Sequence, residues 1–152
     1  AGSMQQAVSV FTSPDMLAAG VPGAGAVSDA ASLALFYQHL LHDPKGLWDS
    51  ALLHDAKTNV RNLFPDMFGR PACRTLGMET AGDDEHAHRR LGGGATSPGT
   101  CGHGGAGGQV AWADPATGLS FVFLTNSFDN NFVRNVHRDR FVSTLAAACV
   151  TS

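Results

Sequence analysis

The chain has few charged residues, and it lacks both a basic face and a long apolar run. Of its 152 residues 15% are charged, and the formal net charge is -3. Phosphate binding needs a basic surface, so nucleic acid is not an expected partner. The longest apolar runs, at 121–124 and 145–150, are far shorter than the roughly 20 residues of a membrane-spanning helix. We therefore expect a soluble chain with no membrane span.

Cysteine is scarce as well. Cys73, Cys101 and Cys149 form no C-x-x-C pair. A disulfide between Cys73 and Cys101 is one interpretation, and free thiols in a reducing compartment are the other, which we favour. Cys101 is either a nucleophile or a small buried apolar residue. Burial is favoured because the one base nearby is His103, two positions away on an expected strand.

What the chain does contain suffices for one domain or a large piece of one. It is 43% hydrophobic and has 18 glycines, while the low charge content indicates surface meant for contact. Residues 1–4, AGSM, have the form of a cloning scar and are left out of fold reasoning. No basic segment followed by a long apolar stretch comes after them, so no targeting signal is expected in the chain.

The first half of the chain is predicted to be helical. Ser28 is the expected N-cap of a helix that ends near His42, before Pro44. A second helix is expected from Asp49 to about Val60. Residues 64–71 form a turn-rich connection, 75–80 a short strand, and 81–100 a long polar, glycine-rich loop.

The second half favours a hairpin and a helix. Residues 108–113 and 119–125 are expected to be antiparallel strands around the turn 114–118. Nearly every residue of 119–124 is apolar, which is typical of a central strand covered on both faces. From about Asn131 the apolar residues recur at helical spacing. A helix is therefore expected to end the chain.

The glycine-rich turn that leads into the hairpin is the strongest functional signal. Five of the seven residues from Gly102 to Gly108 are glycine, and His103 stands among them. A backbone without side chains lets another molecule approach its N–H groups closely. The plainer alternative is a turn that lets two strands pack closely, with His103 as a wall residue. The motif G-x-G-x-x-G also occurs here, but a strand follows it where a dinucleotide site needs a helix, so no dinucleotide is expected.

The segment His103-Gly104-Gly105-Ala106, followed by Gly107, Gly108 and the turn 113–115, resembles the third active-site element of the serine β-lactamase and penicillin-binding family. The similarity is to its class C and esterase-like branch. Residues 22–41 also resemble the family's turn into a helix of the helical subdomain. The resemblance implies an α+β fold, namely part of the β-lactamase/transpeptidase-like fold with an antiparallel sheet and flanking helices. It divides the chain into a helical-subdomain segment (5–64), a connecting strand and loop (65–100), and a C-terminal hairpin with a helix (101–152).

The resemblance also implies site roles. Ala106 would give its backbone N–H, fixed in a strand, to an oxyanion hole, and His103 would occupy the place of the family's lysine. Gly104, Gly105 and Gly107 would line the substrate. The family usually has a hydroxyl residue where this chain has Gly104, and that hydroxyl binds the carboxylate of β-lactams and peptides. Its loss favours ester hydrolysis, since a neutral acyl group needs no such anchor.

The family's nucleophile is not found in this chain. There is no Ser-x-x-Lys, no Tyr-x-Asn and no Ser-Asp-Asn, and the Gly-x-Ser-x-Gly of other hydrolases is missing too. We therefore interpret the chain as the C-terminal part of a serine hydrolase, an esterase, lipase or β-lactamase-like enzyme, and expect this part alone to be inactive. The alternatives are a noncatalytic relative that binds cell-wall or acyl ligands, and a purely structural module.

A second polar cluster precedes the glycine stretch. His86 and His88 follow three acidic residues, Asp83, Asp84 and Glu85. All five fall in one expected loop, whereas zinc sites are held by rigid elements, so we favour a solvated loop and expect no metal and no cofactor. The basic pair Arg89 and Arg90 is assigned to the same loop. Asn126 and Asp129 either reach the cleft or cap the last helix, and capping is favoured.

The resemblance implies two partners for the chain: a small ester or amide substrate and a missing N-terminal segment of the same protein. In the family the strand equivalent to residues 119–125 pairs with N-terminal strands. Its edge is therefore expected to be bare here, and bare edges favour self-association or a domain swap. The resemblance suggests the bacterial cytoplasm or cell envelope, without a choice between them.

Overall fold

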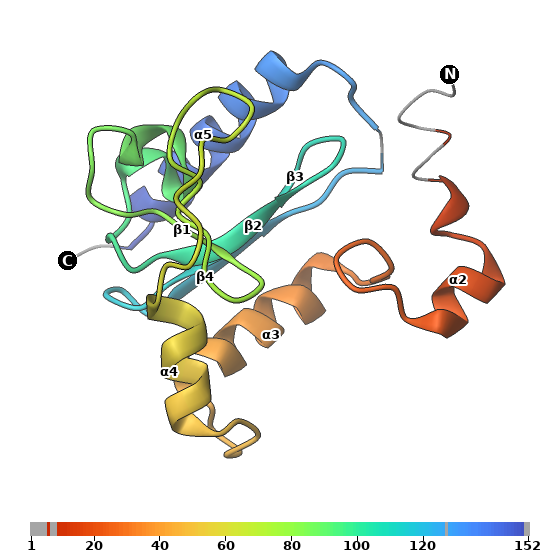
Figure 1. Cartoon of the computed structure of the whole chain (residues 1–152), viewed down its shortest axis with the longest axis horizontal. Coiled ribbons are helices and arrows are strands. Elements are labelled where there is room, and N and C mark those ends of the chain that lie inside the picture. Colours follow the sequence, from red (N-terminus) through yellow and green to blue (C-terminus); the bar gives the residue numbers. More distant parts are fainter. Residues whose placement is uncertain (1–5, 7–8, 127, 151–152) are drawn as a thin grey trace.

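The computed structural model describes residues 6, 9–126 and 128–150. Among the elements whose bounds lie within these residues, three α-helices come first, and a four-stranded sheet with two short 3₁₀ helices and a last α-helix follows (Figure 1). In chain order the elements are α2 (Pro14–Ala19), α3 (Ala30–His42), α4 (Ser50–Thr58), β1 (Glu79–Thr80), η1 (Ala87–Arg89), η2 (Leu91–Gly94), β2 (Cys101–Gly105), β3 (Gln109–Asp114), β4 (Leu119–Phe123) and α5 (Phe132–Ala148). The cloning scar expected at residues 1–4 lies outside the described residues.

The sheet has the strand order β1-β2-β3-β4, and every neighbouring pair is antiparallel. Helix α3 packs against β3 and β4, and α5 contacts β4 and η2. The two helices lie on opposite faces of the sheet (Figure 1). The expected α+β arrangement of an antiparallel sheet with flanking helices is therefore confirmed. The division at residues 64 and 100 stays a prediction, although α3 shares a core with the hairpin.

The helices begin where side chains can bind free backbone N–H groups. Asp29 Oδ1 accepts from Ser32 N–H at 2.8 Å, and Asp49 Oδ1 accepts from Leu52 N–H at 2.8 Å. Each bond satisfies one of the N–H groups that a helix start leaves without an intrahelical partner. The cap of α3 is therefore Asp29, one residue after the predicted Ser28, whereas the predicted start of the second helix at Asp49 is confirmed.

The glycine stretch is mostly a strand. Residues 101–105 form β2 and pair with β3 from Cys101↔Ala113 to Gly105↔Gln109. The turn is confined to residues 106–108, where Gly107 and Gly108 have φ of 80° and 94°. The expectation of a glycine-rich turn over 102–108 is thus wrong for its first half. Ala106 had been expected to lie in a strand, but it lies in the turn.

Apolar side chains form one cluster on each face of the sheet. Tyr37 and Leu40 of α3 pack with Ala111 and Ala113 on one face. On the other face Leu91 of η2, Val110 and Trp112 pack against Val142 and Ala146 of α5. Trp112 is fully buried, and its Nε1–H donates to Ser143 Oγ at 3.0 Å. This bond ties β3 to α5 and satisfies a polar atom that would otherwise be buried unpaired.

Strand β4 differs from its prediction in one respect. Helices α3 and α5 cover its two faces, as its apolar sequence predicts. It is nevertheless the last strand in the sheet order of the described residues, so it is an edge strand and not a central one. The apolar pattern could not distinguish the two positions, because it reports cover above and below a strand and not beside it. Self-association through this edge stays a prediction.

The segment 81–100 is not simply a solvated loop. It contains η1 and η2, and Leu91 belongs to the core. The Arg90 side chain is fully buried, although it was assigned to a solvated loop. Its guanidinium donates to Asp84, to Pro71 O and to Ala81 O at 2.8–3.2 Å. Arg90 therefore joins the start of its own segment, at Ala81 and Asp84, to Pro71 in the preceding connection.

The three cysteines are free, and Cys73 and Cys101 are buried. Burial raises the pKa of the Cys101 thiol, which disfavours the nucleophilic thiolate. The expectation of a small buried apolar residue at Cys101 is confirmed. Among the described residues, no helix is long and apolar enough to cross a membrane.

The turn between β3 and β4 depends on Asp114, which is 2% exposed. Its carboxylate accepts from the hydroxyl of Ser97 and from Ala116 N–H at 3.0 Å. Burial on its own would raise the pKa of Asp114, but these hydrogen bonds outweigh it and lower the pKa overall. The ionised carboxylate therefore stabilises the fold above the unfolded-state pKa of about 3.9, and the gain is lost as the pH falls through the lower folded-state pKa.

We expect Asp114→Asn to lower the free energy of unfolding at neutral pH by about 1–3 kcal/mol. The difference from the unsubstituted protein should shrink as the pH falls below about 4. Urea denaturation at several pH values measures both effects, with Asp83→Asn, at an exposed carboxylate in the 83–85 run, as the control. A difference between Asp114→Asn and the unsubstituted protein that does not change with pH would contradict this account.

Candidate functional site

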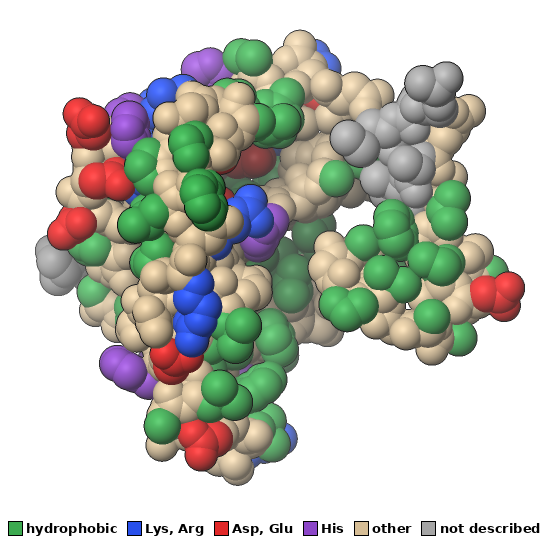
Figure 2. Space-filling model, viewed as in Figure 1, with side chains coloured by type: hydrophobic (Ala, Val, Ile, Leu, Met, Phe, Trp, Pro, Cys, Tyr) green, Lys and Arg blue, Asp and Glu red, His purple; other side chains and the backbone are tan. Residues whose placement is uncertain are grey.

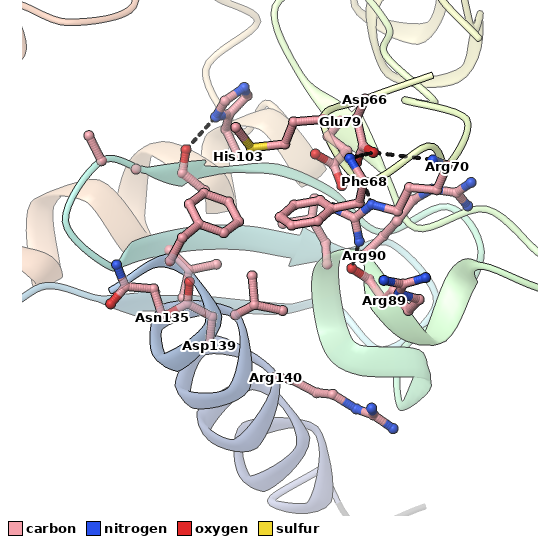
Figure 3. A pocket seen from close by; sticks show the side chains of 18 of the residues that line it. Asp66, Phe68, Arg70, Glu79, Arg89, Arg90, His103, Asn135, Asp139 and Arg140 are labelled. Atoms are coloured by element: carbon pink, nitrogen blue, oxygen red, sulfur yellow. Dashed lines mark hydrogen bonds and ion pairs between the residues drawn. The ribbon is translucent and has the colours of Figure 1, made fainter. Parts of the chain in front are cut away.

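A cavity of about 940 Å³ lies where the end of β2, the connection 62–74 and α5 meet. Asn135 and Asp139 lie on the side of α5 that faces the sheet, while Phe68 enters from the connection (Figure 3). The volume of the cavity is within the range of about 300–1,000 Å³ typical of small-molecule sites. The space-filling view shows a hollow near the middle of one face, bordered by apolar and basic side chains (Figure 2).

His103 lines this cavity from β2 and is exposed. Arg74 Nη1 lies 3.2 Å from His103 Nε2, and His103 Nδ1 lies 2.5 Å from Gly104 O (Figure 3 marks the latter). An arginine can only donate and a carbonyl can only accept. Both bonds therefore need a neutral imidazole that accepts at Nε2 and donates from Nδ1. Of the two side chains, Arg74 is the one that carries a permanent positive charge.

The glycines around His103 differ in their surroundings. Gly104, Gly105 and Ala106 are exposed and line the cavity. A Cβ on Gly104 would meet nothing within 4 Å, whereas a Cβ on the buried Gly107 would lie 2.7 Å from the ring of Phe128. Gly107 is thus required for packing and for its positive φ, and its contribution to a site is limited to its backbone.

Ala106 lies beyond the last register pair of β2 and β3, which is Gly105↔Gln109. It is exposed at the edge of the cavity, outside the packed interior. Its backbone is therefore placed where a bound molecule could reach it. The catalytic roles expected for Ala106 and His103 remain proposals.

One wall of the cavity is apolar. The rings of Phe68 and Phe132 lie 4.9 Å apart, so the connection 62–74 contacts the first turn of α5. Phe64 is 81% exposed and Met67 is 78% exposed, which is unusual for large apolar side chains at a cavity rim. This wall indicates an apolar ligand or a further protein surface.

The carboxyl groups of the cavity fall into two kinds. Burial raises the pKa of Glu79, against the lowering effect of Arg70 and Arg74, and burial also raises the pKa of Asp139. Asp129, in contrast, accepts from Arg134 Nε at 2.7 Å, and this bond lowers its pKa to about 2. The favoured capping role of Asp129 is therefore wrong: the N-cap of α5 is Asn131, and Asp129 lines the cavity, which is the alternative that had been disfavoured.

The described cavity walls offer no activated nucleophile. Ser143 is the one serine among the lining residues, and its hydroxyl accepts from buried Trp112. Among the described residues no group of three or more histidine, cysteine or acidic side chains is placed to hold a metal ion. Asp84, considered above as a metal ligand, instead binds Arg90.

Sequence reasoning found the β2 side of the cavity and missed the other two sides. Arg74, Glu79 and Phe68 were not singled out, because no motif marks them. A signal was nonetheless present, since Phe64, Met67 and Phe68 are large apolar residues within a connection rich in turn formers. Large apolar residues in such a segment indicate a surface that binds a ligand or another protein segment.

The comparisons with known proteins identify the family and support the fold. The family model described as Beta-lactamase matches residues 2–145. The crystal structure of a β-lactamase (Mb2281c) from Mycobacterium bovis is similar over 80% of this chain, with 25% sequence identity and a TM-score of 0.63. The chain spans 44% of the length of that protein. No curated protein matches the chain.

Proposed function

Because the chain belongs to the Beta-lactamase family, we propose that it provides one wall of the active site of a serine hydrolase that acts through an acyl-enzyme. The observation that supports the proposal is the open end of β2, where His103, Gly104 and Ala106 line one cavity. Family membership supports serine hydrolase chemistry in general. The residue roles below, the activity of any longer protein and its substrates are proposed here.

Ala106 N–H is proposed as one of two oxyanion donors. A backbone N–H already in place does not need to reorganise as negative charge develops on the substrate oxygen. Such a donor contributes about 2.7–4 kcal/mol to transition-state stabilisation. The second donor would be the N–H of the nucleophilic serine, which we propose lies on a polypeptide segment outside this sequence.

His103 is proposed to orient the reacting groups as a neutral imidazole, since its Nε2 accepts from Arg74. Gly104 brings no hydroxyl, and the space beside it is open. A β-lactam or peptide carboxylate would therefore lack its usual hydroxyl donor here. This absence supports an ester as the substrate in preference to a β-lactam.

We expect the 152-residue chain to hydrolyse p-nitrophenyl acetate no faster than buffer, because the cavity holds no activated nucleophile. The complete product of the gene that contains this sequence should hydrolyse the ester and should be labelled at a serine by a fluorophosphonate. The measurements are the release of p-nitrophenol and the labelled peptide in mass spectrometry. In the complete product, His103→Gln should reduce kcat, with Arg61→Gln, at a side chain that does not line the cavity, as the matched control.

Two results would contradict the proposal. Ester hydrolysis by the 152-residue chain, lost in His103→Gln, would place a nucleophile within this sequence. A complete gene product that is neither labelled nor active would support the alternative of a noncatalytic binding relative. This alternative is favoured by Ser143, the one serine of the described cavity lining, because its hydroxyl accepts a hydrogen bond from Trp112 and no hydrogen bond among the described residues joins it to a base.

A further inference from the structure

Arg74 is a cation without an anionic partner at the edge of the cavity. Within the described part of the chain it makes no ion pair, in contrast to Arg70, which pairs with Asp66, and Arg90, which pairs with Asp84. Its polar contact is to a neutral acceptor, His103 Nε2, at 3.2 Å. The guanidinium has five N–H donors, so most of them remain available to an incoming acceptor.

Arg74 is held in place by its own backbone. Its backbone pairs in isolated bridges with Asn62 on one side and with Glu79 on the other. Arg74 N–H donates to Asn62 O at 3.0 Å, and Arg74 O accepts from Asn62 N–H at 3.1 Å. The backbone of Arg74 is therefore fixed next to β2, and its exposed side chain reaches His103.

The cavity continues from this cation along apolar surface. Phe68 and Phe132 form one side with their rings 4.9 Å apart, and Leu91, Val110 and Val136 contribute further apolar lining. A permanent charge beside this apolar wall matches an anionic head group with an apolar chain, although other parts of the lining, such as Asn135, Asp139 and Arg140, are polar. Arginine binds carboxylates through paired N–H donors.

We propose that the cavity binds an apolar monocarboxylate, with the carboxylate on Arg74 beside His103 and the hydrocarbon chain against the Phe68–Phe132 pair. This inference rests on the proposed function, because such an acid is the acyl half of a hydrophobic ester. It also revises the view that the site has no anchor for an anion: the anchor is the guanidinium of Arg74 and not a hydroxyl at position 104.

The charged groups nearest to Arg74 leave room for this anion. Glu79 lies within electrostatic range, and burial raises its pKa, while Arg70 and Arg90 add positive charge on the same side. Asp66 and Asp84 already pair with those two arginines. Of these three arginines, Arg74 is the one without an ion pair among the described residues, and Glu79 is the nearby carboxyl group with which a bound carboxylate would compete.

Titration calorimetry with the 152-residue chain tests the proposal, using butyrate, octanoate and octanamide as probes. Octanoate should bind about fourfold more tightly than a shorter acid for every methylene that the cavity buries. Octanamide has the same chain without the charge, and it should bind about tenfold more weakly than octanoate.

Two substitutions separate the two halves of the ligand. Arg74→Gln should weaken octanoate about tenfold or more and leave octanamide unchanged, while Arg74→Lys should restore part of the loss. Phe68→Ala should weaken octanoate and leave butyrate unchanged. Arg61→Gln removes an exposed arginine whose side chain pairs with Asp55 and does not line the cavity, so it is the matched control and should change neither affinity.

The proposal is overturned if octanoate shows no saturable binding, if octanamide binds as tightly as octanoate, or if Arg61→Gln weakens binding as much as Arg74→Gln. Its failure can be told from failure of the hydrolase proposal. An unlabelled, inactive gene product together with charge-dependent octanoate binding would remove the hydrolase and keep the acid site. A labelled, active gene product without octanoate binding would keep the hydrolase proposal and remove the acid site.

Discussion

Replacing Arg90 with methionine should lower the free energy of unfolding by about 3 kcal/mol or more. The guanidinium is fully buried and donates to the carbonyls of Pro71 and Ala81 as well as to Asp84. Methionine fills much of the volume but donates nothing, so two carbonyls lose their partner at about 1–3 kcal/mol each. Urea denaturation monitored by tryptophan fluorescence measures the change.

Arg89 provides the control for this substitution. It is the neighbouring arginine, but its side chain is exposed. Arg89→Met should change stability by no more than about 0.5 kcal/mol. Equal losses for the two variants would mean that the effect is one of net charge, and that Arg90 does not join the segments around Pro71, Ala81 and Asp84.

Gly102→Ala should destabilise the protein by about 3 kcal/mol, because a side chain has no room at this position. A Cβ there would lie 2.1 Å from Ala111 O and 2.6 Å from Trp112 Cα. Both atoms belong to the backbone of β3, so the two strands would have to move apart. Thermal and urea unfolding of the variant measure the loss.

The matched variant is Gly104→Ala, two residues along the same strand. A Cβ on Gly104 meets nothing within 4 Å, so this change should stay within about 0.5 kcal/mol. If the two variants were equally destabilised, the cost would come from backbone conformation, and the close approach of β2 to β3 would not be its cause.

Local patterns in the sequence predicted much of the fold. The helix start at Asp49, the turn 114–118 and the last helix depend on neighbouring residues, and the structure confirms them. The β-lactamase-like architecture was predicted from the resemblance of residues 103–108, and the family match confirms it. Such features are readable because their causes lie within a few residues of each other.

Features whose causes are distant in the chain were not predictable. Arg90 stands in a hydrophilic run, and its buried position depends on carbonyls of residues 71 and 81 that no pattern connects to it. Arg74 and His103 are separated by 29 positions and meet only through the sheet. The edge position of β4 was equally hidden, because a strand's own residues do not specify what lies beside it.

The outer side of β4 has a consequence for how the protein would recognise a neighbour. Main-chain groups at a sheet border pair with any extended polypeptide, whatever its side chains, so selectivity there must come from length, twist and the helices above and below. A fitting strand would be chosen by its shape and by the room that α3 and α5 leave for it. Recognition at this border would therefore tolerate wide variation in the amino acids of the incoming strand.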